Sequence, residues 1–145
     1  MYRLSIKSEF SAAHNLRGYK GKCENLHGHN WKVEAVISAQ EVDKQGLVVD
    51  FHEIKIILKE ILEELDHKYL NGLTYFKKNN PTSENLAKYI YDKISNHLPA
   101  CPGKAKRARV AGYQLKEVTV WESDNCSAAY FRETGARLPA GRQGN

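Results

Sequence analysis

Two segments of alternating apolar and polar residues constrain the fold of this chain more than any other feature. Residues 2–14 show the period-two pattern of a half-buried strand, with an irregularity expected near Ser8 and Glu9. A second strand begins at His27, and one of its faces collects His29, Trp31, Val33, Ala35 and Ile37. If these strands pair as a hairpin around the loop of residues 15–26, the end of the first lies beside the start of the second.

Two helices are expected after this hairpin. The first spans about residues 51–65 with Asp50 as its N-cap, because apolar residues then recur at helical spacing until a glycine-containing segment closes the helix. The second begins after Pro81, and either Thr82 or Ser83 caps it. Both helices carry an apolar stripe, so we expect both to pack on one face of a sheet.

Two further strands are expected near the C-terminus, over residues 113–123 and 127–133. The resulting order, ββααββ, predicts an α+β fold with an antiparallel sheet in a single domain of residues 1–133. Residues 134–145 lack any apolar periodicity and are expected to form a disordered tail.

The composition narrows the class of protein. No apolar run approaches the roughly 20 residues of a membrane span, so no membrane partner is expected. Three cysteines make an odd count for a disulfide framework, which favours reduced thiols and a cytoplasmic location. The formal net charge of +5 suits a nucleic acid, an anionic surface or a phosphorylated small molecule. The aromatic residues are not interleaved with the basic stretch of residues 104–109, which argues against nucleic acid.

Three histidines form a candidate metal site. His27 and His29 are two positions apart, so on a strand both imidazoles leave the same face, and the predicted hairpin adds His14. Three histidines with an open fourth position are typical of a catalytic zinc site. Cys23 is the alternative fourth ligand, which would close the site into a structural one.

If Cys23 is not a ligand, its thiol lies beside a cation and next to Lys22, a setting that favours the thiolate. Cys23 would then be a candidate general base or nucleophile. The vicinal pair Asp66 and His67 could exchange protons with it, although such a pair at a helix end is also an ordinary polar stop.

Six short motifs together resemble the family of 6-pyruvoyl- and 6-carboxy-tetrahydropterin synthases. They occur in the family's order over residues 1–131: "FSAAH", "CENLHGH", "DF", "LDH", "PTSEN" and "VWES". The resemblance implies a T-fold subunit with two helices on one face of the sheet. It also implies an oligomeric barrel, commonly a homohexamer of stacked trimers, with active sites at subunit boundaries.

The resemblance also assigns roles to residues. His14, His27 and His29 match the zinc ligands, Cys23 the catalytic thiol, and Asp66 with His67 its partner pair. Glu122 matches the carboxylate that holds the pterin's 2-amino and N3–H edge, which suits an acceptor facing two donors. A second pterin-contacting stretch is matched by Thr82, Ser83 and Glu84, although Glu84 also reads as a carboxylate that complements a helix dipole.

The implied substrate is 7,8-dihydroneopterin triphosphate, a small polyanion. Zinc would polarise its side-chain hydroxyls, Cys23 would take a proton, and His67, oriented by Asp66, would exchange protons on the other side. No nicotinamide or flavin is implied. Basic residues beside the site, Arg17, Lys20 and Lys22, would suit the triphosphate.

The spacing of Cys23 and the histidines resembles the bacterial 6-carboxy-tetrahydropterin synthases of queuosine biosynthesis, which release acetaldehyde and triphosphate. Glu24 also fits a branch that forms 6-hydroxymethyl-dihydropterin for folate, or it is a solvated loop carboxylate. A 6-pyruvoyl synthase is a further alternative. The alternative from another class is a non-catalytic zinc-binding or RNA-binding module.

Overall fold

The computed structural model describes residues 1–98 and 113–133. The basic stretch of residues 99–112, with Cys101, and the expected tail of residues 134–145 lie outside the described residues.

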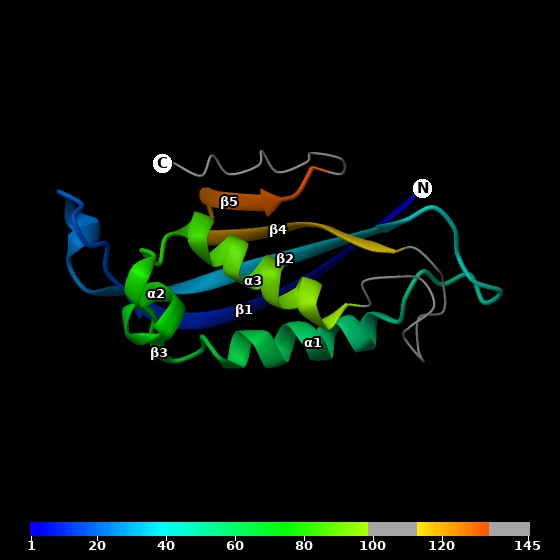
Figure 1. Ribbon diagram of the computed structural model, residues 1–145, viewed down its shortest axis with the longest axis horizontal. Helices are drawn as coiled ribbons and strands as arrows, with labels where there is room; N and C mark the ends of the chain where they lie inside the picture. The colour runs from blue at the N-terminus through cyan, green and yellow to red at the C-terminus, as the bar shows by residue number, and fades with distance from the viewer. Residues whose placement is uncertain (99–112, 134–145) are drawn as a thin grey trace, which may run out of the picture.

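The described part of the chain forms one five-stranded sheet in the order β3-β1-β2-β4-β5 (Figure 1). Neighbouring strands are antiparallel except that the short β3 runs parallel to β1. The strands are β1 (Tyr2–His14), β2 (His27–Ala39), β3 (Lys68–Tyr69), β4 (Gln114–Ser123) and β5 (Cys126–Phe131).

The β1–β2 pairing is unbroken from Tyr2 opposite Ala39 to His14 opposite His27. The irregularity expected near Ser8 and Glu9 is therefore wrong. Ser8 occupies a position in phase with buried Ile6, so a short polar side chain takes an inward place without shifting the register.

The helices are α1 (Phe51–Glu63), α2 (Thr74–Lys78) and α3 (Ser83–His97), with 3₁₀ turns η1 (Lys22–Glu24) and η2 (Leu70–Gly72). The sequence predicted α1 and α3 but missed β3, η2 and α2, so the order ββααββ is incomplete. These elements are two to five residues long, too short to show a period. Helix α1 also ends at Glu63, before the glycine that was expected to close it.

Both long helices have side-chain N-caps. The Asp50 carboxylate accepts a hydrogen bond from the His52 N–H at 2.8 Å. Of the two candidates for α3, the cap is Thr82, whose hydroxyl accepts from the Asn85 N–H at 3.2 Å. Among the described residues, none of the helices is long and apolar enough to cross a membrane.

The hydrophobic core lies between the two long helices and one face of the sheet. Helix α1 contributes Ile54, Leu58 and Ile61, and α3 contributes Leu86, Ile90 and Ile94. Figure 1 shows both helices running alongside the strands. The imperfect alternation expected in β4 arises from a register shift opposite Val36 and Ile37, which lets Leu115 and Val118 both face the core.

We predict that Thr82→Ala lowers the free energy of unfolding by about 1 kcal/mol, because a first-turn N–H of α3 loses its acceptor. Urea unfolding followed by circular dichroism measures the change. Ser83→Ala is the matched control, since the Ser83 hydroxyl makes only a 3.5 Å contact with Glu122. Equal destabilisation by the two substitutions would contradict the prediction.

Candidate metal centre and active site

The strand register brings the three histidines together. His14 pairs directly with His27, and His29 lies two positions along β2, opposite Ala12. All three continue the inward face that Phe10 and Trp31 occupy closer to the middle of the sheet. The histidine cluster is therefore the polar end of the hydrophobic core.

Backbone carbonyls fix the orientation of two rings. His14 Nδ1 lies 2.7 Å from the Pro81 carbonyl oxygen, and His27 Nδ1 lies 2.6 Å from that of Asn25. A carbonyl oxygen only accepts, so each Nδ1 carries the proton and donates it. The two Nε2 atoms, which then present lone pairs, face each other at 3.0 Å.

Trp31 supports the cluster from the core side. Its ring is fully buried and meets His14 and His29 edge-on, with ring centroids 4.9 Å and 5.1 Å apart. Its indole N–H donates to the Ala12 carbonyl at 3.3 Å. Packing against Trp31 thus holds the imidazoles of His14 and His29, and His14 is held by its bond to the Pro81 carbonyl as well.

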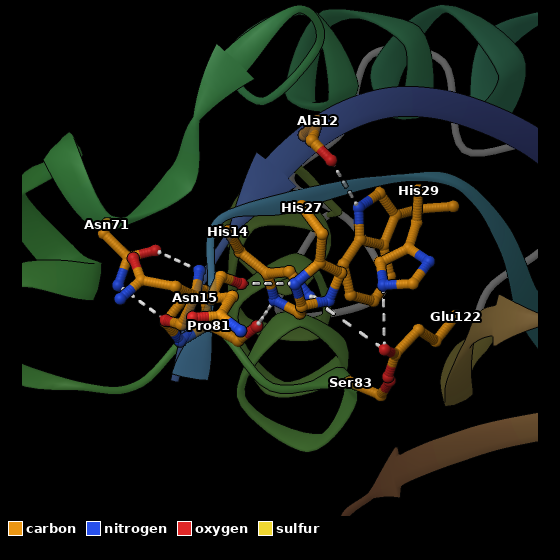
Figure 2. A network of polar contacts seen from close by, with 11 residues as sticks. Ala12, His14, Asn15, His27, His29, Asn71, Pro81, Ser83 and Glu122 are labelled. Carbon is orange, nitrogen blue, oxygen red and sulfur yellow. Dashed lines mark hydrogen bonds and ion pairs between the residues drawn. The ribbon is translucent and has the colours of Figure 1, made fainter. Parts of the chain in front are cut away.

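Glu122 completes the cluster from β4. Its Oε1 lies 2.9 Å from His29 Nε2 and 3.9 Å from His14 Nε2, and its Oε2 lies 3.5 Å from the Ser83 hydroxyl (Figure 2). The residue sits at a register shift between β4 and β5, a feature that often aims a side chain next to active sites. The sequence had not indicated that this carboxylate would touch the histidines.

The four side chains form a donor set that suits a metal ion. One atom each from His14, His27, His29 and Glu122 lie within 4.8 Å of one another. Burial lowers the pKa of His14 and of His29, which favours the neutral, ligating imidazole. His29 Nε2 is a buried atom, and the contact it makes is the 2.9 Å approach of Glu122 Oε1. The facing Nε2 lone pairs of His14 and His27 repel each other unless a cation lies between them, and Glu122 adds an anionic donor at the same point, so the residues present fit a metal.

Cys23 lies outside this donor set. It is half-buried in η1, within the loop of residues 15–26, and its carbonyl accepts from the Leu16 N–H at 2.8 Å. The sequence left open that Cys23 is a fourth ligand beside the three histidines. The fourth side chain whose donor atom converges with theirs is Glu122 instead. The geometry therefore does not support a closed site of one cysteine and three histidines.

The side chains of Asp66 and His67 contact each other on the edge of the sheet. Their closest atoms, Asp66 Oδ2 and His67 Nδ1, are 2.9 Å apart, and the Ser11 N–H donates to Asp66 Oδ1 at 2.9 Å. These two contacts, the Ser11 bond first, lower the pKa of Asp66, so the carboxylate is ionised at neutral pH. The stabilisation it provides is present above its unfolded pKa and is lost as the pH falls through the lower folded value.

His67 is the only described non-glycine residue with positive φ, at 54°, and its N–H donates to the Ser11 carbonyl at 2.6 Å. Its ring is largely exposed and lines a cavity of about 520 Å³ that also touches Gly28 and Tyr69. Within the described residues, no hydrogen bond, ion pair or ring contact joins the Asp66–His67 pair to Cys23 or to the histidine cluster. His29 of the cluster lines the same cavity as His67, whereas in the part of the chain that the structure describes no hydrogen bond or ion pair joins Cys23 to Asp66 or His67.

The remaining candidate residues differ in their contacts and in their exposure to solvent. Thr82 caps α3, Ser83 approaches Glu122, and Glu84 is an exposed first-turn carboxylate without a recorded partner among the described residues. Glu24 is exposed in η1, beside Cys23. Of the three basic candidates, Arg17 donates to the Phe76 carbonyl at 2.5 Å, whereas Lys20 and Lys22 are exposed.

The comparisons agree with this architecture. A family model described as 6-pyruvoyl tetrahydropterin synthase matches residues 3–133. The structure of the Caenorhabditis elegans 6-pyruvoyl tetrahydropterin synthase matches with a TM-score of 0.75 at 28% identity, covering 91% of this chain and 96% of that one. The protein adopts the T-fold of these enzymes, and the chain belongs to the 6-pyruvoyl tetrahydropterin synthase family.

Two curated relatives carry the names of two different enzymes. The 6-carboxy-5,6,7,8-tetrahydropterin synthase of Rickettsia felis is 32% identical over 111 residues, which cover 65% of this chain and 80% of that protein. The dihydroneopterin monophosphate aldolase of Pyrococcus furiosus is 33% identical over 122 residues, which cover 84% and 90%. The protein is accordingly an enzyme of the lyase type, with a site that accommodates a metal ion.

We predict that His14→Ala lowers zinc affinity by more than the roughly 10- to 100-fold lost when a ligand loses only its hydrogen-bond partner. Cys23→Ala should leave affinity unchanged, because Cys23 is not among the converging donors. Competition with a chromophoric chelator measures both. Loss of zinc in Cys23→Ala would contradict the prediction. It would show that Cys23 is the fourth ligand of a structural site and not a catalytic thiol.

Proposed function

We propose that this protein is a 6-carboxy-5,6,7,8-tetrahydropterin synthase of queuosine biosynthesis. It converts 7,8-dihydroneopterin triphosphate and water into 6-carboxy-tetrahydropterin, acetaldehyde and triphosphate. The observation that carries the proposal is the convergence of His14, His27, His29 and Glu122 at the end of the β1–β2 hairpin. The names of curated relatives support the choice of product.

In this proposal His14, His27 and His29 hold zinc, which supplies Lewis acidity toward the substrate's side-chain hydroxyls. Cys23 removes a proton from the substrate side chain, and its place in the loop beside the cluster supports that role. Asp66 fixes the ring of His67 through the 2.9 Å contact to Nδ1, which leaves Nε2 to exchange a proton with substrate.

Glu122 is the proposed acceptor for the pterin's 2-amino and N3–H groups, with Thr82, Ser83 and Glu84 at the same wall of the site. Its two oxygens face His29 and Ser83, so the carboxylate stands between the histidine cluster and the first turn of α3. The partial positive charge of a helix N-terminus favours a carboxylate there. Lys20 and Lys22 are the proposed triphosphate contacts, because Arg17 is already engaged with Phe76.

The proposed assembly is a homohexamer of two trimers with each site at a subunit boundary. It is supported by the absence, among the described residues of one chain, of a hydrogen bond or ion pair between Cys23 and the Asp66–His67 pair. A second chain could present its own Asp66–His67 pair to the Cys23 loop. The single domain of residues 1–133 and the cytoplasmic location remain predictions from the sequence.

Incubating the zinc-loaded protein with 7,8-dihydroneopterin triphosphate should yield 6-carboxy-tetrahydropterin and acetaldehyde in equal amounts. Liquid chromatography with fluorescence detection measures the pterin, and an alcohol dehydrogenase assay measures the aldehyde. Formation of neither product by a protein with full zinc content would refute the proposed function.

The second candidate is aldol cleavage to 6-hydroxymethyl-dihydropterin, favoured by the Pyrococcus furiosus relative and by the exposed Glu24 carboxylate. Both activities in one site are also compatible with these observations. We predict that any hydroxymethyl product disappears in Glu24→Gln while the carboxy product persists. Loss of both products together would make Glu24 part of the carboxy-forming reaction.

We predict that Asp66→Asn lowers kcat by about 10²- to 10⁴-fold, the usual contribution of a positioned acid or base. The asparagine amide keeps an oxygen that accepts from the Ser11 N–H. It removes the negative charge that Asp66 places beside His67 Nδ1. Asp124→Asn is the matched control, since Asp124 forms an exposed ion pair with Lys32. Steady-state kinetics and melting temperatures would contradict the prediction if the two variants behaved alike.

A further inference from the structure

Two asparagine side chains form hydrogen bonds with the backbone of residues 15–17, just beyond the end of β1. The Asn15 N–H donates to Asn71 Oδ1 at 3.0 Å, and Asn71 Nδ2 donates to the Asn15 carbonyl at 2.8 Å. Figure 2 shows this pair beside His14. A primary amide that bonds both backbone groups of one residue reproduces the contact that a neighbouring strand makes.

Asn80 repeats the arrangement two residues further along. The Arg17 N–H donates to Asn80 Oδ1 at 3.0 Å, and Asn80 Nδ2 donates to the Arg17 carbonyl at 2.9 Å. Asn15 lies just past the end of β1 and Arg17 begins a turn, and one asparagine amide bonds both backbone groups of each. Asn71 and Asn80 therefore form a surrogate strand, here called the amide clasp, along one edge of residues 15–17.

The clasp continues the edge that β3 begins. Strand β3 pairs with β1 at Ala12 and Ala13. Beyond the end of β3, the Asn71 amide forms the hydrogen bonds to the backbone of Asn15. The residue between the two clasped positions, Leu16, faces the opposite edge, and its N–H donates to the Cys23 carbonyl at 2.8 Å. The clasp thus holds residues 15–17 on one side, and those residues hold Cys23 on the other.

Asn71 is anchored in η2, and Asn80 is anchored at the start of α3 beside the residue that orients His14. Asn71 is only 7% exposed in η2, so its amide depends on these bonds for its hydrogen-bonding partners. The Asn80 carbonyl accepts from Asn85 Nδ2 and from the Thr82 N–H, both at 2.8 Å, at the start of α3. The next residue, Pro81, bonds His14 through its carbonyl.

We propose that Asn71 and Asn80 are positioning residues that set the location of the Cys23 thiol relative to the histidine cluster. The clasp fixes residues 15–17, and the Leu16–Cys23 backbone bond transmits that position to η1. The catalytic part of this inference rests on the proposed function, in which Cys23 exchanges a proton with substrate. The structural part, control of the Cys23 position, does not depend on any reaction.

The test uses Asn71→Asp and Asn80→Asp in the zinc-loaded, full-length protein. Each change keeps an acceptor for the backbone N–H and replaces the Nδ2 donor with an oxygen that opposes the backbone carbonyl. Asn79→Asp is the matched control, because Asn79 Nδ2 also donates to a backbone carbonyl, that of Tyr75 at 2.9 Å, but does not touch residues 15–17.

The first readout is the iodoacetamide alkylation rate of Cys23, measured by peptide mass spectrometry at a pH where the thiols are ionised. Exposed Cys126 is the internal reference. We expect the Cys23 rate to rise about fivefold or more in both clasp variants, with the Cys126 rate unchanged, as a local opening made about 1 kcal/mol easier would give. Asn79→Asp should match the wild type.

The second readout is kinetic. With 7,8-dihydroneopterin triphosphate, kcat should fall about 10- to 100-fold in the clasp variants, as a small misplacement of a reacting group gives, while KM and zinc content stay close to those of Asn79→Asp. Should Asn71→Asp fail to fold, the partly exposed Asn80→Asp carries the test alone.

Unchanged Cys23 alkylation, or equal changes in Asn79→Asp, would overturn the inference. A wild-type protein that does not turn over the substrate would defeat the proposed function instead, and the alkylation result would still decide whether the clasp positions Cys23.

Discussion

The unbroken register between β1 and β2 is the constraint on which the site depends. It places His14 opposite His27 and His29 two positions away on the same inward face. A slip of one residue would turn one strand's inward side chains to the other face and separate the histidines. The thirteen-residue strands hold this register by burying Ile6, Phe10, Trp31 and Val33 on the face that carries the cluster. Core packing and metal-site geometry are therefore set by the same pairing.

The cluster is polar, yet it is built into the end of a hydrophobic core. Burying an imidazole without partners is unfavourable, and here the carbonyls of Pro81 and Asn25 compensate by accepting from the Nδ1 atoms of His14 and His27. The same bonds fix the tautomers that leave Nε2 free. The site is preorganised for a cation because the contacts that stabilise the folded chain also aim its ligands.

Periodicity in the sequence predicted the four long strands, both long helices and the shared face of His27 and His29. The motifs identified the family, which the comparisons confirm. The contact between Glu122 and His29 and the amide clasp were not predictable, since they join residues far apart in sequence through side-chain geometry that no period records. The error at Ser8 has a related cause. A polar residue at an inward position looks like a break in the pattern, and only packing shows that it fits.

Cys23 makes no hydrogen bond or ion pair with Asp66 or His67 within the described residues, and pairing of the sheet edge with another subunit would supply one. The helices cover one face of the sheet, and the cavity lined by Gly28 and His67 involves the edge where β3 ends after two residues. Because the edge strand β3 has two residues, most of β1 has no pairing strand on that side within the described residues. Pairing of such an edge with another subunit would satisfy its backbone groups and enclose His67. Assembly and completion of the active site would then be a single event, which is why the proposed barrel and the proposed chemistry are linked.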